Sequence, residues 1–147
     1  AGFYGVAGWH RESHLLRALF EGVAFEHRRH VDVLRGAGIR FARASLSGGG
    51  ARSEIWPQMF ADMLGIPVSI PVCAEAGALG AAIAAGVAVG AFPGLGEAVR
   101  AMTAERAHFS PAPGMTDFYE GRYRTYRLLT EAMKPVWESM AAAHARP

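Results

Sequence analysis

The chain has 147 residues, of which 51% are hydrophobic and 19% are charged, a composition typical of a single globular domain. Its formal net charge is only +2, which excludes the strongly basic surface of a nucleic-acid-binding protein. The one cysteine, Cys73, excludes an intrachain disulfide and a cysteine-based metal cluster, and we expect a cytoplasmic protein. The first residues show no basic segment followed by an apolar one, so no signal peptide is predicted.

Residues 12–35 predict a long amphipathic helix that ends at Gly36. The positions of its apolar face recur at helical spacing and are Leu15, Leu19, Val23, Val31 and Leu34. Residue 11, where a capping side chain would stabilise the helix start, is an arginine, so we expect a poorly capped start. A short segment at 39–47, bounded by glycines on both sides, then predicts a strand.

Three consecutive glycines, Gly48–Gly50, separate this strand from a second helix. The helix is predicted to run from Ser53, its N-cap, to Gly65, with Pro57 in its first turn. Residues 66–72 predict a second strand, whose two prolines indicate either a sheet edge or the ends of the strand.

The second half of the chain is predicted to be mostly helical. An Ala/Gly-rich segment at 76–91 predicts a tightly packed core helix, too short and too rich in glycine to span a membrane. A short helix is predicted at 97–104, and the Pro/Gly-rich stretch 108–116 predicts a connector without regular structure. The last helix is predicted over 116–143, with three tyrosines on one face that serve packing.

The predicted order of elements is helix, strand, glycine loop, helix, strand and further helices, which is α/β alternation. Two strands are fewer than a sheet of this class normally holds. We therefore expect either that further strands come from elsewhere or that the chain is one piece of a larger protein.

The glycine loop has two interpretations. A strand followed by glycines and a helix N-terminus forms an anion site, because free N–H groups point outward and glycine lets a phosphate approach the backbone. The alternative is a structural turn, since the loop has neither a Walker A motif nor a GxGxxG fingerprint. The loop pattern by itself leaves both interpretations open.

The segment 47–82 resembles the C-terminal signature of the FGGY carbohydrate kinases, most of all their xylulokinase-like branch. The pattern combines GGGARSEIWPQMFADMLG at 48–65 with EAGALGAA at 75–82. The matching positions are Gly48, Gly49, Gly50, Ala51, Arg52, Ser53, Trp56, Gln58, Ala61, Asp62 and Gly65, then Glu75, Gly77, Ala78, Leu79, Gly80, Ala81 and Ala82. The resemblance covers most of residues 3–140, and its N-terminal part is more similar to L-xylulose kinases than to D-xylulose kinases.

The resemblance implies an α/β fold of the ribonuclease H-like, actin/hexokinase-type ATPase class. It implies that the loop lines a bound nucleotide, and the implied nucleotide-binding residues are Gly48, Gly49, Gly50, Ala51, Ser53 and Glu54. The glycines and Ala51 would lie along the phosphates and ribose, with Ser53 and Glu54 near the adenosine. Gly77 and Gly80 would let the third helix pack closely against its neighbours. The implied cofactors are ATP and the Mg²⁺ that is bound with ATP.

The implied function is transfer of the ATP γ-phosphoryl group to a hydroxyl of a small sugar, a pentulose such as xylulose. Residues 1–147 would be the C-terminal portion of such a kinase. Because the family's general-base aspartate and sugar-binding residues lie upstream of the matched segment, we expect no catalytic residue in this chain and no activity from it alone. The alternative is a non-catalytic nucleotide-binding or assembly domain of the same fold. The expected partners are ATP, a small sugar and a second copy of the protein, with no nucleic acid and no membrane.

A few other side chains are candidates for chemistry. Histidines stand at helical spacings that can hold a metal, in the pairs His10/His14 and His27/His30. No carboxylate or cysteine completes either set, so we expect solvated histidines and no metal site. Asp62 is expected to anchor a loop or cap a neighbour, Cys73 to be buried or inert, and Trp56 to be a core residue.

Overall fold

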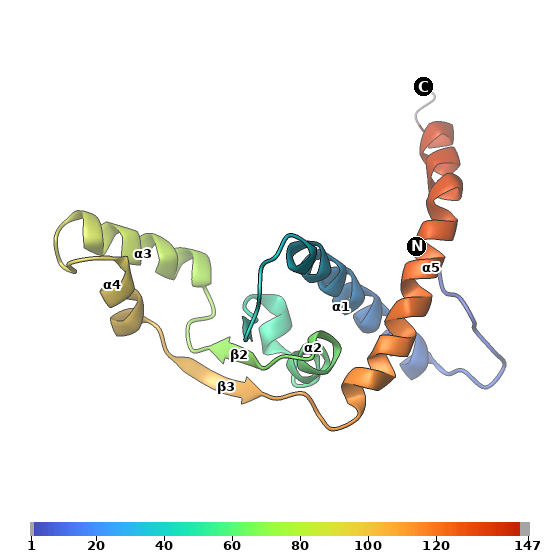
Figure 1. Ribbon diagram of the computed structural model, residues 1–147, viewed down its shortest axis with the longest axis horizontal. Coiled ribbons are helices and arrows are strands. Elements are labelled where there is room, and N and C mark those ends of the chain that lie inside the picture. The colour runs from blue at the N-terminus through green and yellow to red at the C-terminus, as the bar shows by residue number, and fades with distance from the viewer. Residues whose placement is uncertain (1, 145–147) are drawn as a thin grey trace.

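The computed structural model describes residues 2–144, apart from the side chain of residue 144, as an α/β arrangement (Figure 1). In chain order the elements are α1 (Glu12–Gly36), β1 (Ala44–Ser45), a short 3₁₀ helix η1 (Gly49–Arg52), α2 (Trp56–Leu64), β2 (Val68–Pro71), α3 (Ala76–Ala88), α4 (Leu95–Met102), β3 (Glu105–Phe109) and α5 (Met115–His144). The predicted helices are confirmed, with shifts of a few residues at their ends.

The described strands form one sheet in the order β1–β2–β3. β1 and β2 run parallel, with Ala44 opposite Val68, and β3 runs antiparallel to β2, with Phe109 opposite Val68. Pro67 precedes β2 and Pro71 is its last residue. Of the two predicted placements for these prolines, the strand ends are confirmed and the sheet edge is wrong, because β2 lies in the middle.

The predicted connector at 108–116 is wrong at its start, because β3 extends through Phe109. His108 lies opposite Ser69 and Ala107 opposite Ile70 in the antiparallel ladder. The segment ERAHF contains no Val, Ile or Thr and no regular apolar alternation, so its strand conformation comes from pairing with β2 and not from local propensity. The sheet therefore has one strand more than predicted.

Helix α2 lies at the centre of the packing, in contact with α1, α5, β2, β3 and η1. Its residues from Met59 to Leu64 are all buried. Pro57 lies in its first turn and Gly65 ends it with a left-handed φ of 65°, both as predicted. The core cluster combines α1, α2, β2 and α5 and comprises Ala24, Phe25, Met59, Phe60, Ala61, Met63, Leu64, Val68, Tyr119 and Tyr123.

Helix α1 buries a different face from the predicted one. Leu19 and Val23 are 52% and 43% exposed. The buried residues of α1 are Glu21, Ala24, Phe25 and Arg28. The carboxylate of Glu21 is buried because it accepts hydrogen bonds from Arg17 Nε and Arg122 Nη1, each at 2.9 Å. Ion pairing, within α1 through Arg17 and across the α1–α5 contact through Arg122, thus compensates the burial of this carboxylate.

Helix α3 is not the tightly packed core helix predicted at 76–91. Ile83 is its one buried residue in the described part of the chain. A Cβ built on Gly77 or Gly80 would meet nothing within 4 Å, so the close helix packing expected of these glycines is not found. Helix α3 packs against α4, and the two form a hairpin apart from the group of α1, α2 and α5 (Figure 1).

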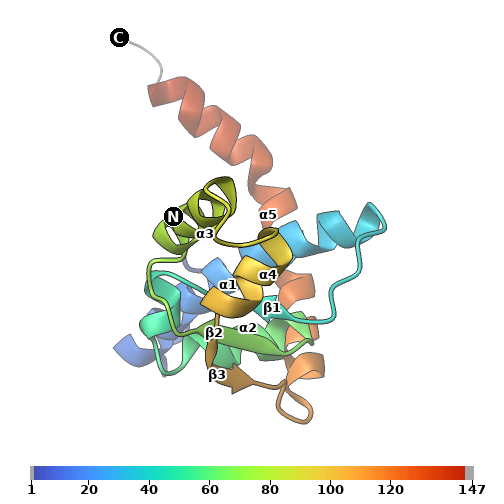
Figure 2. The same ribbon diagram turned by 90° about the vertical axis from the view of Figure 1, so that its left-hand side faces the viewer.

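Helix α5 follows the predicted course and buries two of its tyrosines, Tyr119 and Tyr123, against Phe25. The packing role predicted for the tyrosine face is confirmed. The C-terminal part of α5 extends away from the other elements (Figure 2). Within residues 2–144, no helix combines the length and apolar character that a membrane crossing would need.

Candidate functional site: the glycine loop between β1 and α2

The glycine loop leaves β1 and enters α2 through the short helix η1. Gly48 has φ 74° and ψ −151°, a backbone conformation that is almost confined to glycine. Within the turn, the Ala51 N–H donates to the Gly48 carbonyl at 3.2 Å and the Ser53 N–H to the Gly50 carbonyl at 3.3 Å. Because the first such bond starts at Ala51, the N–H groups of Gly49 and Gly50 have no carbonyl of the turn to donate to.

Helix α2 starts at Trp56, three residues later than predicted, and Ile55 is its N-cap residue. Ser53 still has the capping contacts expected of it. Its Oγ accepts hydrogen bonds from the N–H groups of Ile55 at 3.2 Å and Trp56 at 3.1 Å. The Ser53 hydroxyl is therefore engaged in the fold, whereas the neighbouring Glu54 is exposed.

The three glycines meet different surroundings. A Cβ on Gly50 would lie 3.1 Å from Cε3 of the Trp56 ring, so packing disfavours a side chain there. Gly48 is required by its φ of 74°. A Cβ on Gly49 would meet nothing within 4 Å, and its φ is not positive. Within the described residues, neither a packing contact nor a positive φ accounts for the missing side chain of Gly49.

Trp56 links the loop to helix α1. Its Nε1–H donates to the Phe20 carbonyl at 3.3 Å, and its ring meets the Phe20 ring edge-on at 5.1 Å. It also lies against Phe60 in the core, with ring centroids 6.0 Å apart. Trp56 is thus a partly buried packing residue, as expected, and it holds Gly50 against the body of the protein.

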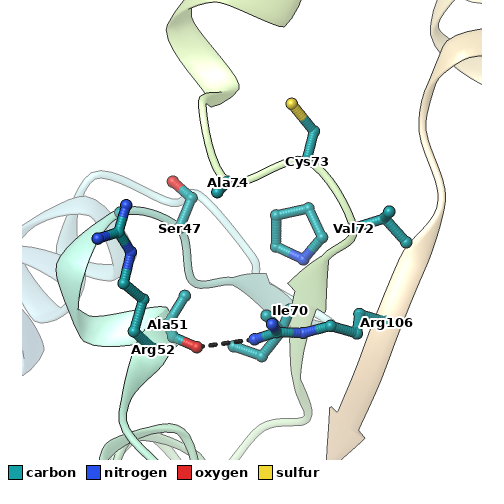
Figure 3. Close-up of a pocket in the computed structure, with 10 residues that line it drawn as sticks. Ser47, Ala51, Arg52, Ile70, Val72, Cys73, Ala74 and Arg106 are labelled. Carbon is teal, nitrogen blue, oxygen red and sulfur yellow. Dashed lines mark hydrogen bonds between the residues drawn. The ribbon is translucent and has the colours of Figure 1, made fainter.

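Strand β3 supplies a second wall to the loop through Arg106, whose Nη2 donates to the Ala51 carbonyl at 3.0 Å (Figure 3). Between the loop and the strands lies a cavity of about 30 Å³, room for about one water molecule. Its lining comprises Ser47, Gly48, Ala51, Arg52, Ile70, Pro71, Val72, Cys73, Ala74 and Arg106. Of the predicted nucleotide-binding residues, Gly48 and Ala51 reach this cavity, whereas Gly49, Gly50, Ser53 and Glu54 do not line it.

Two arginines, Arg52 and Arg106, lie beside the loop. Arg52 lies 3.6 Å from the carboxylate of Glu75, and both side chains are mostly exposed, so this pair is weak. Arg106 donates to a neutral carbonyl, which leaves its charge in place. Cys73, expected to be buried or inert, is half-buried in the cavity wall. A partly enclosed backbone turn with two guanidinium groups beside it is a surface to which an anion can bind.

A larger groove of about 820 Å³ adjoins the small cavity. It shares Ser47, Pro71 and Cys73 with that cavity and extends over residues of the strands, α3 and α4. Its volume falls within the range of about 300–1,000 Å³ found for small-molecule sites. The sequence did not indicate this groove, because part of its wall is the α4–β3 segment, whose strand was not predicted.

The histidine pairs serve the local backbone. His14 Nδ1 accepts from the Arg11 N–H at 3.0 Å, so the start of α1 is capped by His14 and the expectation of a poorly capped start is wrong. His10 Nδ1 accepts from the Ala7 N–H at 2.7 Å, and His27 Nδ1 lies 2.9 Å from the Val23 carbonyl. Residues 2–144 contain no group of three His, Cys, Asp or Glu that could hold a metal ion.

Two further residues of the signature, Gln58 and Asp62, hold the segment between β3 and α5 by hydrogen bonds. Asp62 is 5% exposed, and its Oδ1 accepts from the Ala112 N–H and from Gln58 Nε2, each at 2.8 Å. Gln58 Nε2 also donates to the Ser110 carbonyl at 2.8 Å. The expectation that Asp62 anchors a loop is confirmed.

Comparison with known proteins shows that residues 3–89 match the C-terminal domain of the FGGY family of carbohydrate kinases. The chain belongs to this family. This FGGY chain is 37% identical over 137 residues to a probable L-xylulose kinase of Haemophilus influenzae. The aligned region covers 91% of this chain and 27% of that protein. It is 34% identical over 134 residues to the L-xylulose/3-keto-L-gulonate kinase of Escherichia coli, with 91% and 27% covered.

Solved structures give the same assignment. The xylulose kinase from Rhodospirillum rubrum superposes with a TM-score of 0.79 at 32% identity, over 93% of this chain and 28% of that chain. A ligand-bound xylulose kinase from Lactobacillus acidophilus superposes with a TM-score of 0.83 at 21% identity, over 90% of this chain and 27% of that chain. This likeness shows that the two chains share a fold. The predicted actin-type α/β ATPase fold is therefore confirmed, and this FGGY chain spans about a quarter of the length of its relatives.

Proposed function

We propose that this chain forms the nucleotide-binding side of an ATP-dependent sugar kinase, with residues 1–147 as its C-terminal portion and a pentulose such as xylulose as substrate. The observation that carries the proposal is Gly49. It lies in the FGGY signature, in the loop that follows β1, and a Cβ at this position would meet no described atom within 4 Å. The names of the relatives, which include L-xylulose and xylulose kinases, support a pentulose substrate.

The loop fits a nucleotide phosphate in three respects. The sides of Gly48 and Gly49 that would carry a Cβ face open space, so a ligand can approach the backbone there. The N–H groups of Gly49 and Gly50 are free of bonds within the turn. Arg52 and Arg106 add positive charge beside them.

Each predicted residue then has a role toward ATP, which supplies the phosphoryl group when bound. Gly48, Gly49, Gly50 and Ala51 would hold the phosphates and ribose through their backbone. Ser53 keeps the loop in place through its bonds to the start of α2, and the exposed Glu54 lies on the side where the adenosine is expected. Because phosphoryl transfer depends mainly on positioning and charge neutralisation, a rigid backbone cradle is an effective contribution.

Mg²⁺ would arrive with ATP. The described residues provide no three-ligand carboxylate or histidine set for it, so its ligands would be phosphate oxygens and water, a common arrangement for this ion. The sugar site and the general base would come from the upstream part of the longer polypeptide. The chain would therefore bind and orient ATP without performing the transfer by itself.

The test is an ATP-dependent phosphorylation assay with the intact polypeptide that contains this chain, using L-xylulose and D-xylulose in parallel and coupled detection of ADP. We expect saturable ADP release that depends on one of the two sugars. ATP binding without phosphorylation of either pentulose or of other small sugars would favour the non-catalytic nucleotide-binding domain instead. Absence of ATP binding would contradict the proposal altogether.

A further inference from the structure

A bulge in β3 brings an arginine to the glycine loop. Ile70 of β2 lies opposite Ala107 and Pro71 opposite Glu105, so Arg106 is an extra residue with no partner on β2. The register breaks at Pro71, which has no N–H to donate to the ladder. A bulge of this kind changes the direction in which a strand side chain points. Here the Arg106 side chain extends to the loop (Figure 3).

Arg106 contacts a carbonyl that the loop itself leaves unused. At the two ends of η1 the carbonyls of Gly48 and Gly50 accept from backbone N–H groups of the turn, whereas the Ala51 carbonyl accepts from Arg106 Nη2 at 3.0 Å. This contact joins residues 55 positions apart and fixes the orientation of the peptide that follows Ala51. The loop is thus held at one side by Trp56 against Gly50 and at the other by Arg106.

We propose that Arg106 is a positioning residue for nucleotide binding, which acts through the Ala51 carbonyl to keep the glycine loop in the conformation that receives ATP. The inference rests on the nucleotide role proposed above. Arginine suits this task because its planar guanidinium can hold one carbonyl and still keep its charge near the loop. Since Arg106 is exposed, its replacement leaves the core intact, and the effect falls on ATP binding.

The test compares Arg106→Gln and Arg106→Lys with a matched control, Arg43→Gln. Arg43 is also exposed and lies 3.3 Å from Glu105, the residue next to Arg106, so both Gln variants remove one positive charge beside the same strand. Only Arg106→Gln loses the bond to the loop. The Kd for ATP, the KM values for ATP and sugar, and the Tm are measured on the intact protein.

Arg106→Gln should weaken ATP binding roughly five- to tenfold, the loss expected for one ordinary intramolecular hydrogen bond. Arg106→Lys should recover most of the affinity, Arg43→Gln should stay near wild type, and the sugar KM and Tm should not move. Equal ATP affinities for Arg106→Gln and Arg43→Gln would overturn the positioning role of Arg106. The nucleotide role of the loop would still stand in that case, provided that the wild-type protein binds ATP. A lower Tm with unchanged ATP affinity would also overturn it, and a wild type that binds no ATP overturns both.

Discussion

Substitution of the three loop glycines by alanine separates folding from nucleotide binding, because each glycine lacks a side chain for a different reason. In Gly50→Ala the new methyl would lie 3.1 Å from Cε3 and 3.4 Å from Cζ3 of Trp56. The indole is held by its bond to the Phe20 carbonyl and has to move by a few tenths of an ångström. Overpacking of this kind costs about 1–3 kcal/mol, and we expect the lower end because Trp56 is partly exposed.

Gly48→Ala should destabilise the protein through its backbone. The φ of 74° and ψ of −151° lie in a region that side-chain-bearing residues avoid, at a cost of about 1–3 kcal/mol. A Cβ there would meet nothing within 4 Å, so strain and not a clash is the cause. The ATP affinity of Gly48→Ala is expected to fall as well, because the start of the loop changes its course.

Gly49→Ala should behave in the opposite way. The methyl group meets no atom within 4 Å and the backbone is compatible with alanine, so stability should be unchanged or higher by about 0.4–1 kcal/mol. If phosphates approach the backbone here, the methyl group obstructs them, and ATP affinity should fall tenfold or more, about 1.4 kcal/mol.

Thermal unfolding and ATP titration of the intact protein give both quantities for each variant. A change of about 1 kcal/mol moves the Tm by roughly 2–4 °C for 150–250 residues and by less for a longer protein. Normal ATP binding by a stable Gly49→Ala protein would refute the nucleotide interpretation of the loop. An unchanged Tm in Gly50→Ala would refute the packing explanation for that glycine.

Further predictions concern the chain as a whole and two buried groups. The isolated 147-residue chain should phosphorylate no pentulose, because the base and sugar site are expected upstream, and any such activity would contradict this prediction. Light scattering should show a dimer or larger species of the isolated chain, formed through the open edge of β1, and a monomer would contradict that prediction. Asp62→Ala should cost about 1–3 kcal/mol in urea unfolding because the Ala112 N–H loses its acceptor, and Asp62→Asn should cost less because it keeps that oxygen. Burial raises the pKa of Tyr123 from 10.0 to about 12, so between these pH values the unfolded chain loses the phenol proton and the folded protein keeps it. The free energy of unfolding should therefore decrease as the pH rises from 10 to 12. In absorbance titrations, Tyr123→Phe should remove the phenolate step at the highest pH; retention of that step would contradict the assignment.

Features with a local physical cause were predictable from the sequence. Gly65 ends α2 and Ser53 caps the turn before it, because a left-handed glycine and a hydroxyl acceptor act within a few residues of their own position. The family of the loop residues Gly48–Ala51 was predictable because the whole signature matched, and their role in nucleotide binding stays a prediction. The physical reason for each separate glycine could not be predicted, because the contact of Gly50 with Trp56 depends on the course of the chain in three dimensions.

Arg106 could not be predicted as part of the site. Its position depends on the pairing of β3 with β2 and on the bulge opposite Pro71, and the sequence ERAHF carries no strand signal. A register shifted by one residue would turn Arg106 away from the loop. The residues that line a cavity from a partner strand are thus set by long-range pairing and not by local pattern.

The errors in predicted burial are all of one kind: residues expected to be packed are exposed. Leu19 and Val23 of α1 and Gly77 and Gly80 of α3 were expected to pack against other elements, and all four are open in the described chain. A pattern of apolar and small residues indicates that a surface is covered in the native protein, but not by which segment. Since the chain spans about a quarter of the length of its relatives, we expect the missing cover to come from the rest of the proposed longer kinase. The predicted burial of these surfaces is therefore wrong for the described chain, and together with the open edge of β1 the exposed apolar surfaces should promote the self-association expected of the isolated chain.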